Sequence, residues 1–184
     1  MRKLIFGINL TLDGCCDHTK LAGTDEVHDY FSHLLLDADV LVYGRKTYQL
    51  MVPFWPEVAK NNSGPTKAMN DFAQAFDSVS KIVVFSKSLV KAEGKTTIVR
   101  TNLQDEILRL KQEPGKNILV GGVDIPSQLI KLGLVDEYCF VIQPIIAGEG
   151  RRLFDGVNLP ESLNLKLIES KVFQSGFVSL RYAK

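Results

Sequence analysis

The chain contains the run Asp39-Val40-Leu41-Val42-Tyr43-Gly44-Arg45-Lys46-Thr47-Tyr48. Its consecutive apolar residues, 40–43, predict a buried parallel strand, because such a strand is covered on both faces. Gly44 allows a sharp turn where this strand ends. A helix that begins near Lys46 would direct unpaired N–H groups at an anion, and the guanidinium of Arg45 suits a phosphate. The run therefore indicates a phosphate-bearing ligand, although an ordinary strand, turn and helix with solvated bases has the same pattern.

Two further predicted strands end in residues of similar character. Ser86-Lys87-Ser88 follows the apolar run 81–85, and Gly121-Gly122-Val123 follows the run 117–120. In open α/β sheets, ligands bind outside the carboxyl ends of the strands, so these ends share one edge with the end of the first run. Together they supply basic side chains, hydroxyl groups and a glycine pair that lets the backbone approach a diphosphate. We expect a phosphorylated-cofactor site at this edge.

The rest of the chain completes an α/β pattern. Residues 3–11 predict a first strand, and a polar loop at 15–23 leads to Thr24, which can cap a helix. Alternating apolar residues on either side of 174–176 predict a C-terminal antiparallel hairpin. We therefore expect a single domain, residues 1–184, with a mostly parallel central sheet flanked by helices. Other predicted elements are helices at 27–35, 66–76 and 103–110 and one capped by Asp124, strands at 97–99 and 135–142, and a loop at 53–65.

The composition limits the class of protein. Contents of 45% hydrophobic and 23% charged residues are ordinary for a globular protein, and a net charge of +1 argues against a nucleic-acid surface. The apolar segment 3–12 is too short to cross a membrane. Cys15, Cys16 and Cys139 have no disulfide or metal-ligand spacing, and with no signal peptide they indicate a reducing cytoplasm. We expect no metal and no nucleic-acid or membrane partner.

Several well-known motifs are missing from the sequence. It contains no GxGxxG, GxxxxGK[ST], HExxH or GxSxG, which disfavours a Rossmann dinucleotide domain, a P-loop NTPase, a zinc protease and an α/β-hydrolase. His18, His28 and His33 lack metal-ligand spacing and are interpreted as surface residues.

Four segments occur in order along nearly the whole chain: Thr11-Leu12-Asp13-Gly14, 38–48, Gly121-Gly122-Val123 and 144–154. With these segments and its order of elements, the chain resembles the dihydrofolate reductase fold. It resembles more closely the reductase domain of riboflavin biosynthesis, the RibD C-terminal domain, and the stand-alone proteins grouped with it. This resemblance implies NADPH as the cofactor and a reductase activity.

The resemblance also implies roles for individual residues. A 2′-phosphate held by an arginine fork and hydroxyl groups agrees with the chemistry of such sites, although Lys87 would equally suit a solvated surface. The implied contacts are Arg45, Ser86 and Lys87 with the 2′-phosphate, Gly44, Lys46 and Thr47 with the diphosphate from one side, Gly121, Gly122 and Val123 with it from the other, and Ile8 with the nicotinamide.

The chain departs from that pattern in three places. Dihydrofolate reductases carry a substrate-binding carboxylate in their first helix, whereas Asp29 lies off the apolar stripe of this predicted helix. The Pro-Trp signature of the folate enzymes is also absent after Gly14. The sequence lacks H-x-E and P-C-x-x-C, which excludes the zinc deamination of the bifunctional riboflavin enzyme. We therefore do not expect dihydrofolate reduction or deamination.

Four residues are candidates for the substrate side of the site. Asp13 beside the polar loop is the candidate proton donor, or else a turn-forming aspartate. Trp55, the one tryptophan, either stacks on a heteroaromatic substrate or plugs a hydrophobic lid. Asn9 interrupts an apolar strand and Gln143 ends one, so each needs a polar partner in the protein or in the substrate.

These observations predict an NADPH-dependent reductase that transfers hydride to a C=N or C=O group of a pterin-like or aminopyrimidine substrate. The alternative is a catalytically silent nucleotide-binding module of the same fold, favoured by the missing helix carboxylate. The terminal hairpin offers a surface for a homodimer.

Overall fold

The computed structural model describes residues 1–159 and 161–184 and contains one eight-stranded sheet. The strand order is β4-β3-β2-β5-β1-β6-β8-β7. All pairs from β4 to β6 are parallel, and β8 pairs antiparallel with both β6 and β7. The predicted fold class, a mostly parallel sheet with a C-terminal antiparallel hairpin, is confirmed. The strands are β1 (Leu4–Thr11), β2 (Ala38–Gly44), β3 (Lys81–Phe85), β4 (Thr96–Val99), β5 (Asn117–Val120), β6 (Glu137–Gln143), β7 (Lys166–Val172) and β8 (Val178–Ala183).

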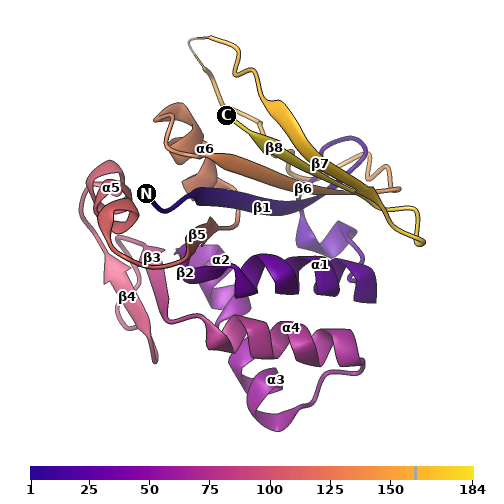
Figure 1. Ribbon diagram of the computed structural model, residues 1–184, viewed down its shortest axis with the longest axis horizontal. Helices are drawn as coiled ribbons and strands as arrows, with labels where there is room; N and C mark the ends of the chain where they lie inside the picture. Colours follow the sequence, from indigo (N-terminus) through magenta and orange to yellow (C-terminus); the bar gives the residue numbers. More distant parts are fainter. Residues whose placement is uncertain (160) are drawn as a thin grey trace.

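Helices cover the two faces of the parallel part of the sheet, from β4 to β6 (Figure 1). One face packs on α1 (Asp25–Leu36) and α4 (Lys67–Ser78), and the other on α5 (Leu103–Gln112) and α6 (Asp124–Lys131). The start of α1 agrees with the prediction, because the Thr24 hydroxyl accepts a hydrogen bond from the N–H of Val27 at 3.4 Å. The short helices are α2 (Arg45–Met51), α3 (Trp55–Asn61) and a 3-10 turn, η1 (His18–Lys20).

Strand β2 contributes to both layers of the core, as its apolar run predicts. Val40 and Val42 pack in the cluster with α5 and α6, whereas Leu41 and Tyr43 pack in the cluster with α1 and α4. All four side chains are buried. Each such side chain contributes about 1.5–3 kcal/mol on leaving water, so β2 is anchored from both sides.

Two predicted local structures are wrong. The predicted loop at 53–65 contains α3, whose first turn includes Pro56, because proline needs no N–H partner there. This helix ends at Asn61, and the following residue, Asn62, adopts a left-handed φ of 47°. The residue that caps α6 is Val123 rather than Asp124, and Asp124 instead forms an ion pair with Arg151. Local propensity did not reveal that distant partner.

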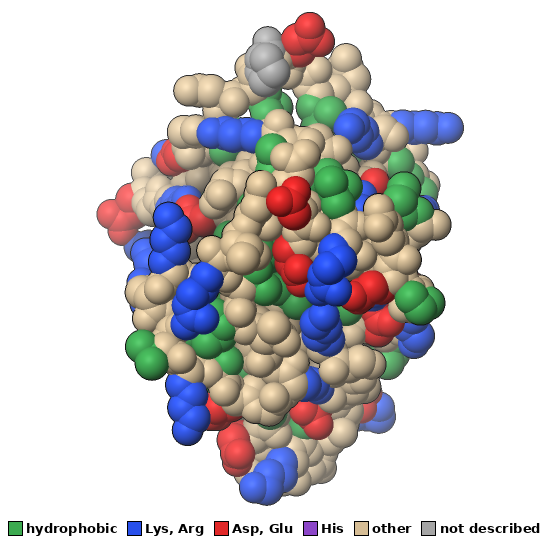
Figure 2. Space-filling model, turned by 90° about the vertical axis from the view of Figure 1, so that its left-hand side faces the viewer, with side chains coloured by type: hydrophobic (Ala, Val, Ile, Leu, Met, Phe, Trp, Pro, Cys, Tyr) green, Lys and Arg blue, Asp and Glu red, His purple; other side chains and the backbone are tan. Residues whose placement is uncertain are grey.

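The surface seen from the α5 side of Figure 1 carries charges of both signs. Figure 2 shows Lys and Arg side chains interspersed with Asp and Glu over this face, without a broad patch of one sign. Within the described ranges, 1–159 and 161–184, no helix has the length and apolar character needed to span a bilayer.

A buried carboxylate joins the parallel half of the sheet to the hairpin. Glu137 on β6 accepts hydrogen bonds from Lys3 at 2.6 Å and from Arg181 on β8 at 2.8 Å, and only 3% of it is exposed. Burial alone would raise the pKa of Glu137, but the bonds from Lys3 and Arg181 outweigh burial and lower it.

We expect the Glu137→Gln variant to lose about 1.5–3 kcal/mol of unfolding free energy at pH 7, because it loses charged hydrogen bonds. Since the folded-state pKa is lowered, the contribution is present above the unfolded value near 4.5 and disappears as the pH falls through the folded value. Urea titrations from pH 7 to pH 3 should therefore show the two proteins converging in acid. Glu93→Gln, at an exposed position, is the control. A constant difference at every pH would contradict this account.

Candidate active site

A cleft of about 960 Å³ opens at the carboxyl ends of β1, β2 and β5. The segments after β2 and β5 meet at this cleft, as the sequence predicted, whereas Ser86 and Lys87 after β3 do not line it. The predicted site residues that line the cleft are Ile8, Asn9, Gly44, Arg45, Lys46, Thr47, Trp55, Gly121, Gly122 and Val123. Four do not line it: Asp13, Ser86, Lys87 and Gln143.

In one wall of the cleft, two glycines pack against side chains of β2 and α2. Gly122 has a φ of +88°, and a Cβ atom there would overlap the Oγ1 of Thr47. A Cβ on Gly121 would lie 2.9 Å from the ring of Tyr43. The two turns that follow β2 and β5 can therefore meet only because glycine occupies both positions after β5.

The helices that follow these turns begin without side-chain caps. Gly44 precedes α2 and Val123 precedes α6, and neither start has a side-chain hydrogen bond to its first N–H groups. Uncapped N–H groups at two helix starts on one cleft form a wall suited to a multiply charged anion.

The structure brings only part of the predicted 2′-phosphate-binding set to the cleft. Arg45 is exposed at the cleft, and its guanidinium donates a hydrogen bond to Gln49 Oε1 at 3.1 Å. Phe85 pairs with Gly44 in the sheet, which places Ser86 next to Arg45 along this edge. The Ser86 hydroxyl accepts the N–H of Leu89 at 2.9 Å and closes its own turn. Of the predicted trio Arg45, Ser86 and Lys87, Arg45 alone faces the cleft.

Strand β1 forms the floor of the cleft. Ile8 packs toward the core cluster that contains α6. The oxygen of the Asn9 side chain is buried, with no hydrogen-bond partner in the described part of the chain. The described residues therefore do not supply the polar partner that Asn9 was expected to need.

An aromatic group closes the side of the cleft next to α1. Trp55 packs edge-on against Phe72 with ring centroids 4.5 Å apart, and against His28 at 5.8 Å. The interpretation of His28 as a surface residue is wrong: its ring lines the cleft, and burial lowers its pKa. The available signal was its spacing of three residues from Phe31 and seven from Leu35, which places it on the same helix face.

Gln143 has a partner within the protein. Its side-chain amide is fully buried, accepting from the N–H of Ala22 and donating to the Ala22 carbonyl, both at 2.9 Å. This pair of bonds fixes the end of the polar loop 15–23 to the sheet. The geometry supports the structural alternative for Gln143 and not a substrate contact.

Asp13 is likewise held by the protein. Its carboxylate accepts hydrogen bonds from the Thr11 hydroxyl at 2.6 Å and from the N–H groups of Ala147 and Gly148, each at 3.0 Å. These bonds, that of Thr11 above all, lower the pKa of Asp13 to about 2. A carboxylate that is ionised at neutral pH and directed away from the cleft is unsuited to the predicted role of proton donor.

The loop held by Asp13 also reaches the mouth of the cleft. Arg151 forms an ion pair with Asp124 at 2.6 Å, and both side chains line the cleft. Cys16 contacts the same loop through its N–H, which donates to the Arg151 carbonyl at 2.8 Å. Neither Asp124 nor Arg151 was a predicted site residue, because the pairing depends on contacts between distant segments.

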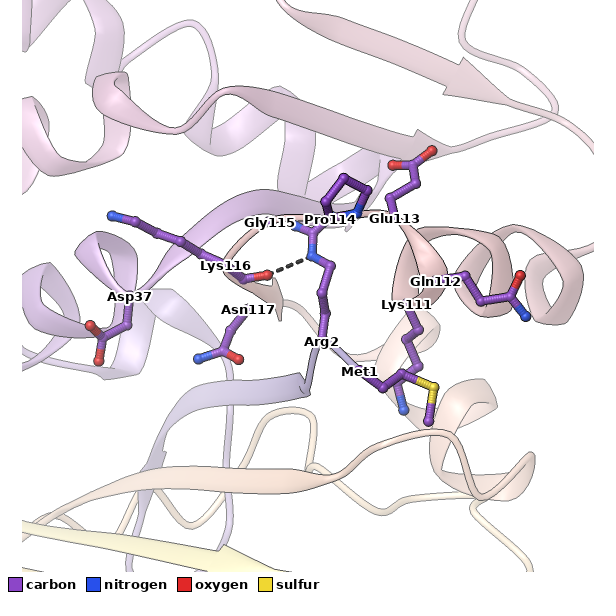
Figure 3. A pocket seen from close by; sticks show the side chains of 10 residues that line it. All are labelled: Met1, Arg2, Asp37, Lys111, Gln112, Glu113, Pro114, Gly115, Lys116 and Asn117. Carbon is purple, nitrogen blue, oxygen red and sulfur yellow. Dashed lines mark hydrogen bonds between the residues drawn. The ribbon is translucent and has the colours of Figure 1, made fainter.

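A second depression, of about 710 Å³, lies at the opposite end of the sheet. Arg2 in it donates a hydrogen bond to the Lys116 carbonyl (Figure 3). The same guanidinium forms an ion pair with Asp39. Figure 3 shows the side chains of Asp37, Lys116 and Glu113 pointing apart rather than toward a common centre. The depression is therefore a polar surface region rather than a competing site. Within residues 1–159 and 161–184, no group of three or more His, Cys, Asp or Glu side chains is placed to hold a metal ion.

Comparison with known proteins identifies a family with this architecture. Residues 2–179 match the RibD C-terminal domain family. The uncharacterized protein YyaP of Bacillus subtilis (strain 168) is 30% identical over 190 residues, or 98% of this chain and 94% of YyaP. A Shewanella sp. PV-4 protein provisionally assigned to riboflavin biosynthesis superposes with a TM-score of 0.73 at 23% identity, covering 100% of this chain and 98% of that one.

A two-function enzyme also has this fold. The diaminohydroxyphosphoribosylaminopyrimidine deaminase/5-amino-6-(5-phosphoribosylamino)uracil reductase of Thermotoga maritima superposes with a TM-score of 0.67 at 15% identity, covering 99% of this chain and 56% of that one. The predicted dihydrofolate reductase-like fold, in its RibD C-terminal form, is confirmed.

The contact between the two turns can be tested with alanine. We expect Gly122→Ala to lower the unfolding free energy by more than Gly94→Ala, because both glycines have positive φ but only Gly122 lacks space for a Cβ. Backbone strain alone costs about 1–2 kcal/mol, which sets the expected effect at Gly94. Thr47→Ala should restore part of the difference when combined with Gly122→Ala. Equal losses in urea melts of Gly122→Ala and Gly94→Ala would show that the turns are not in contact.

Proposed function

The chain belongs to the RibD C-terminal domain family, and we propose that it is an NADPH-dependent reductase. The substrate would be pterin-like or an aminopyrimidine, as for the 5-amino-6-(5-phosphoribosylamino)uracil reductases. One observation carries the proposal: the turn after β5 lies against the Thr47 side chain of α2 at Gly122, where no further side chain fits, and two uncapped helix starts open onto the same cleft. A dinucleotide diphosphate needs such a wall of backbone N–H groups.

The residues of the cleft fit NADPH. The N–H groups of Lys46 and Thr47 would meet the diphosphate from the α2 side, and Gly122 and Val123 would meet it from the α6 side. Arg45 would contact the 2′-phosphate, because its planar guanidinium forms paired charged hydrogen bonds with phosphate oxygens. Ser86 and Lys87 would join Arg45 only through a change in the turn that Ser86 now closes.

Bound NADPH supplies hydride, and the chain positions the acceptor. β1 ends inside the cleft, between the side that faces α1 and the side that faces α6. Its backbone near Ile8 would therefore orient the nicotinamide. Trp55 and Phe72 exclude water from the acceptor side, which strengthens the polar contacts made there. Asp13 stays ionised and holds the loop at Ala147 by a hydrogen bond, so we assign it a positioning role rather than proton transfer.

The alternative is a silent nucleotide-binding module, and turnover distinguishes the two. We expect the protein to oxidise NADPH, followed at 340 nm, with at least one member of a panel of pterins, aminopyrimidine ribosides and small carbonyl compounds. NADPH binding without turnover on the whole panel would favour the silent module. Failure to bind NADPH at all would overturn both.

We expect Arg45→Ala to weaken NADPH binding by about 1.5–3 kcal/mol, the loss typical of a hydrogen bond to a charged group, and to leave NADH binding nearly unchanged. Isothermal titration with both cofactors measures the difference. Arg109→Ala, an exposed change on α5 outside the cleft lining, is the matched control. A similar loss of affinity for NADPH and NADH would contradict a contact between Arg45 and the 2′-phosphate.

We further propose that β7 pairs two copies of the chain. Every residue of this edge strand is exposed, including Leu167 at 50%, Ile168 at 51% and Val172 at 75%. Long exposed apolar edges are normally covered. In light-scattering chromatography we expect a dimer that Ile168→Asp converts to a monomer, while Leu108→Asp on α5 does not. A monomeric wild-type protein would refute this assembly.

A further inference from the structure

Two segments that are far apart in the sequence pair with each other beyond the end of β1. Residues 151–153, here called the strap, are joined to residues 14–16 by an antiparallel bridge. The N–H of Cys16 donates to the Arg151 carbonyl at 2.8 Å, and a second backbone bond, at 3.1 Å, follows at Leu153. The backbone that carries Arg151 is therefore held in place at the mouth of the cleft.

The side chain of Arg151 leaves the strap and reaches the start of α6. Its guanidinium pairs with Asp124, the first residue of α6, with 2.6 Å between Nη2 and Oδ1. Both side chains line the cleft, as does Lys46 of α2. The hydrogen bond from Arg151 and, to a smaller extent, the charge of Lys46 lower the pKa of Asp124. Two cations and one carboxylate from three separate elements therefore lie at the cleft, and their net charge favours an anion.

Arg151 has hydrogen-bond donors that the protein does not use. A guanidinium carries five N–H bonds in a planar fork, whereas within residues 1–159 and 161–184 this one donates a single hydrogen bond, to Asp124. The side chain of Arg151 is 46% exposed, so its other N–H groups are open to solvent at the cleft. Arg151 can therefore hold Asp124 and bind a second anion at the same time.

Asp124 gives this second contact its importance. A carboxylate beside a bound diphosphate places like charges side by side, which is unfavourable unless a cation lies between them. We propose that Arg151 is a positioning residue whose guanidinium bridges Asp124 and the diphosphate of the dinucleotide. This inference rests on the proposed reductase function, and it adds a contact from the strap to those from α2 and α6.

Ligands with and without a diphosphate test this contact. NADPH has both the 2′-phosphate and the diphosphate, whereas 2′-AMP has the 2′-phosphate alone. By isothermal titration, we expect Arg151→Gln to bind NADPH about tenfold more weakly and to bind 2′-AMP as the wild type does. Arg45→Ala should instead weaken the binding of both ligands. Unchanged NADPH binding by Arg151→Gln, or an equal loss for 2′-AMP, would overturn the inference.

The Asp124→Asn substitution separates a direct contact from simple neutralisation. In the Arg151→Gln background, the unpaired Asp124 carboxylate repels the diphosphate, so the added Asp124→Asn substitution should restore part of the NADPH affinity. Full recovery would show that Arg151 only neutralises Asp124, and no recovery would show that Asp124 does not lie beside the diphosphate. Either of these two results would overturn the proposed bridge.

Thermal melts without ligand show whether the variants keep their fold. Arg109→Gln on α5 is the matched control, because Arg109 is 49% exposed and also pairs with a carboxylate, that of Glu106, at 2.6 Å. Exposed ion pairs contribute little to stability, so both Arg109→Gln and Arg151→Gln should melt close to the wild-type temperature. Only Arg151→Gln should lose NADPH affinity, and an equal loss in Arg109→Gln would contradict a contact specific to Arg151.

The wild-type protein allows a test that needs no variant. Phenylglyoxal modifies exposed arginines, and peptide mapping by mass spectrometry measures the modification at each one. NADPH should protect both Arg45 and Arg151, whereas 2′-AMP should protect Arg45 alone. If NADPH protects Arg45 but not Arg151, this inference is wrong and the proposed function stands. If NADPH does not bind at all, the proposed function fails and the bridge fails with it.

Discussion

The contact between the turns after β2 and β5 is the constraint on which the site depends. Because these strands are adjacent and parallel, with Val42 opposite Val120, their exits lie next to each other. The N–H of Gly121 donates to the Val42 carbonyl at 3.2 Å, and Gly122 then passes so close to Thr47 that no side chain fits. The sheet fixes the distance between the turns, and glycine makes that distance tolerable. Both helix starts consequently open onto one cleft.

The rim of the cleft depends on a different kind of interaction. Asp13 and Gln143 each use a side chain to bind backbone groups of a distant loop. Loops otherwise lose the most conformational entropy when a ligand orders them. With these bonds already made, the loops that carry Cys16 and Arg151 are held before any ligand arrives, which lowers the ordering cost of binding. Both residues looked like substrate contacts because a pinned loop and a binding site need the same polar side chains.

Sequence reasoning succeeded where the information was local. The apolar run of β2 and the cap at Thr24 each depend on neighbouring residues, and each occurs as predicted. It failed where a partner was remote: Gln143 bonds to a residue 121 positions away. The error at His28 has another cause, because a polar residue beside an apolar stripe is normally solvated. Here Trp55 and Phe72 arrive from the segment that was predicted to be a loop and from the helix after it, and they cover the ring.

The division of the cleft follows from β1 alone. A strand directs successive side chains to opposite faces, so Ile8 and the next residue, Asn9, face different sides of the cleft. Toward α6 and α2 lie the two glycines after β5 and the side chains of Arg45, Lys46 and Asp124, whereas toward α1 lie aromatic rings and the Asn9 amide. A cofactor and an acceptor that bind on these two sides of the cleft can meet only where β1 passes between them. Under the proposed function, the residues at the end of β1 would decide the chemistry, whereas Arg45 after β2 would decide which cofactor binds.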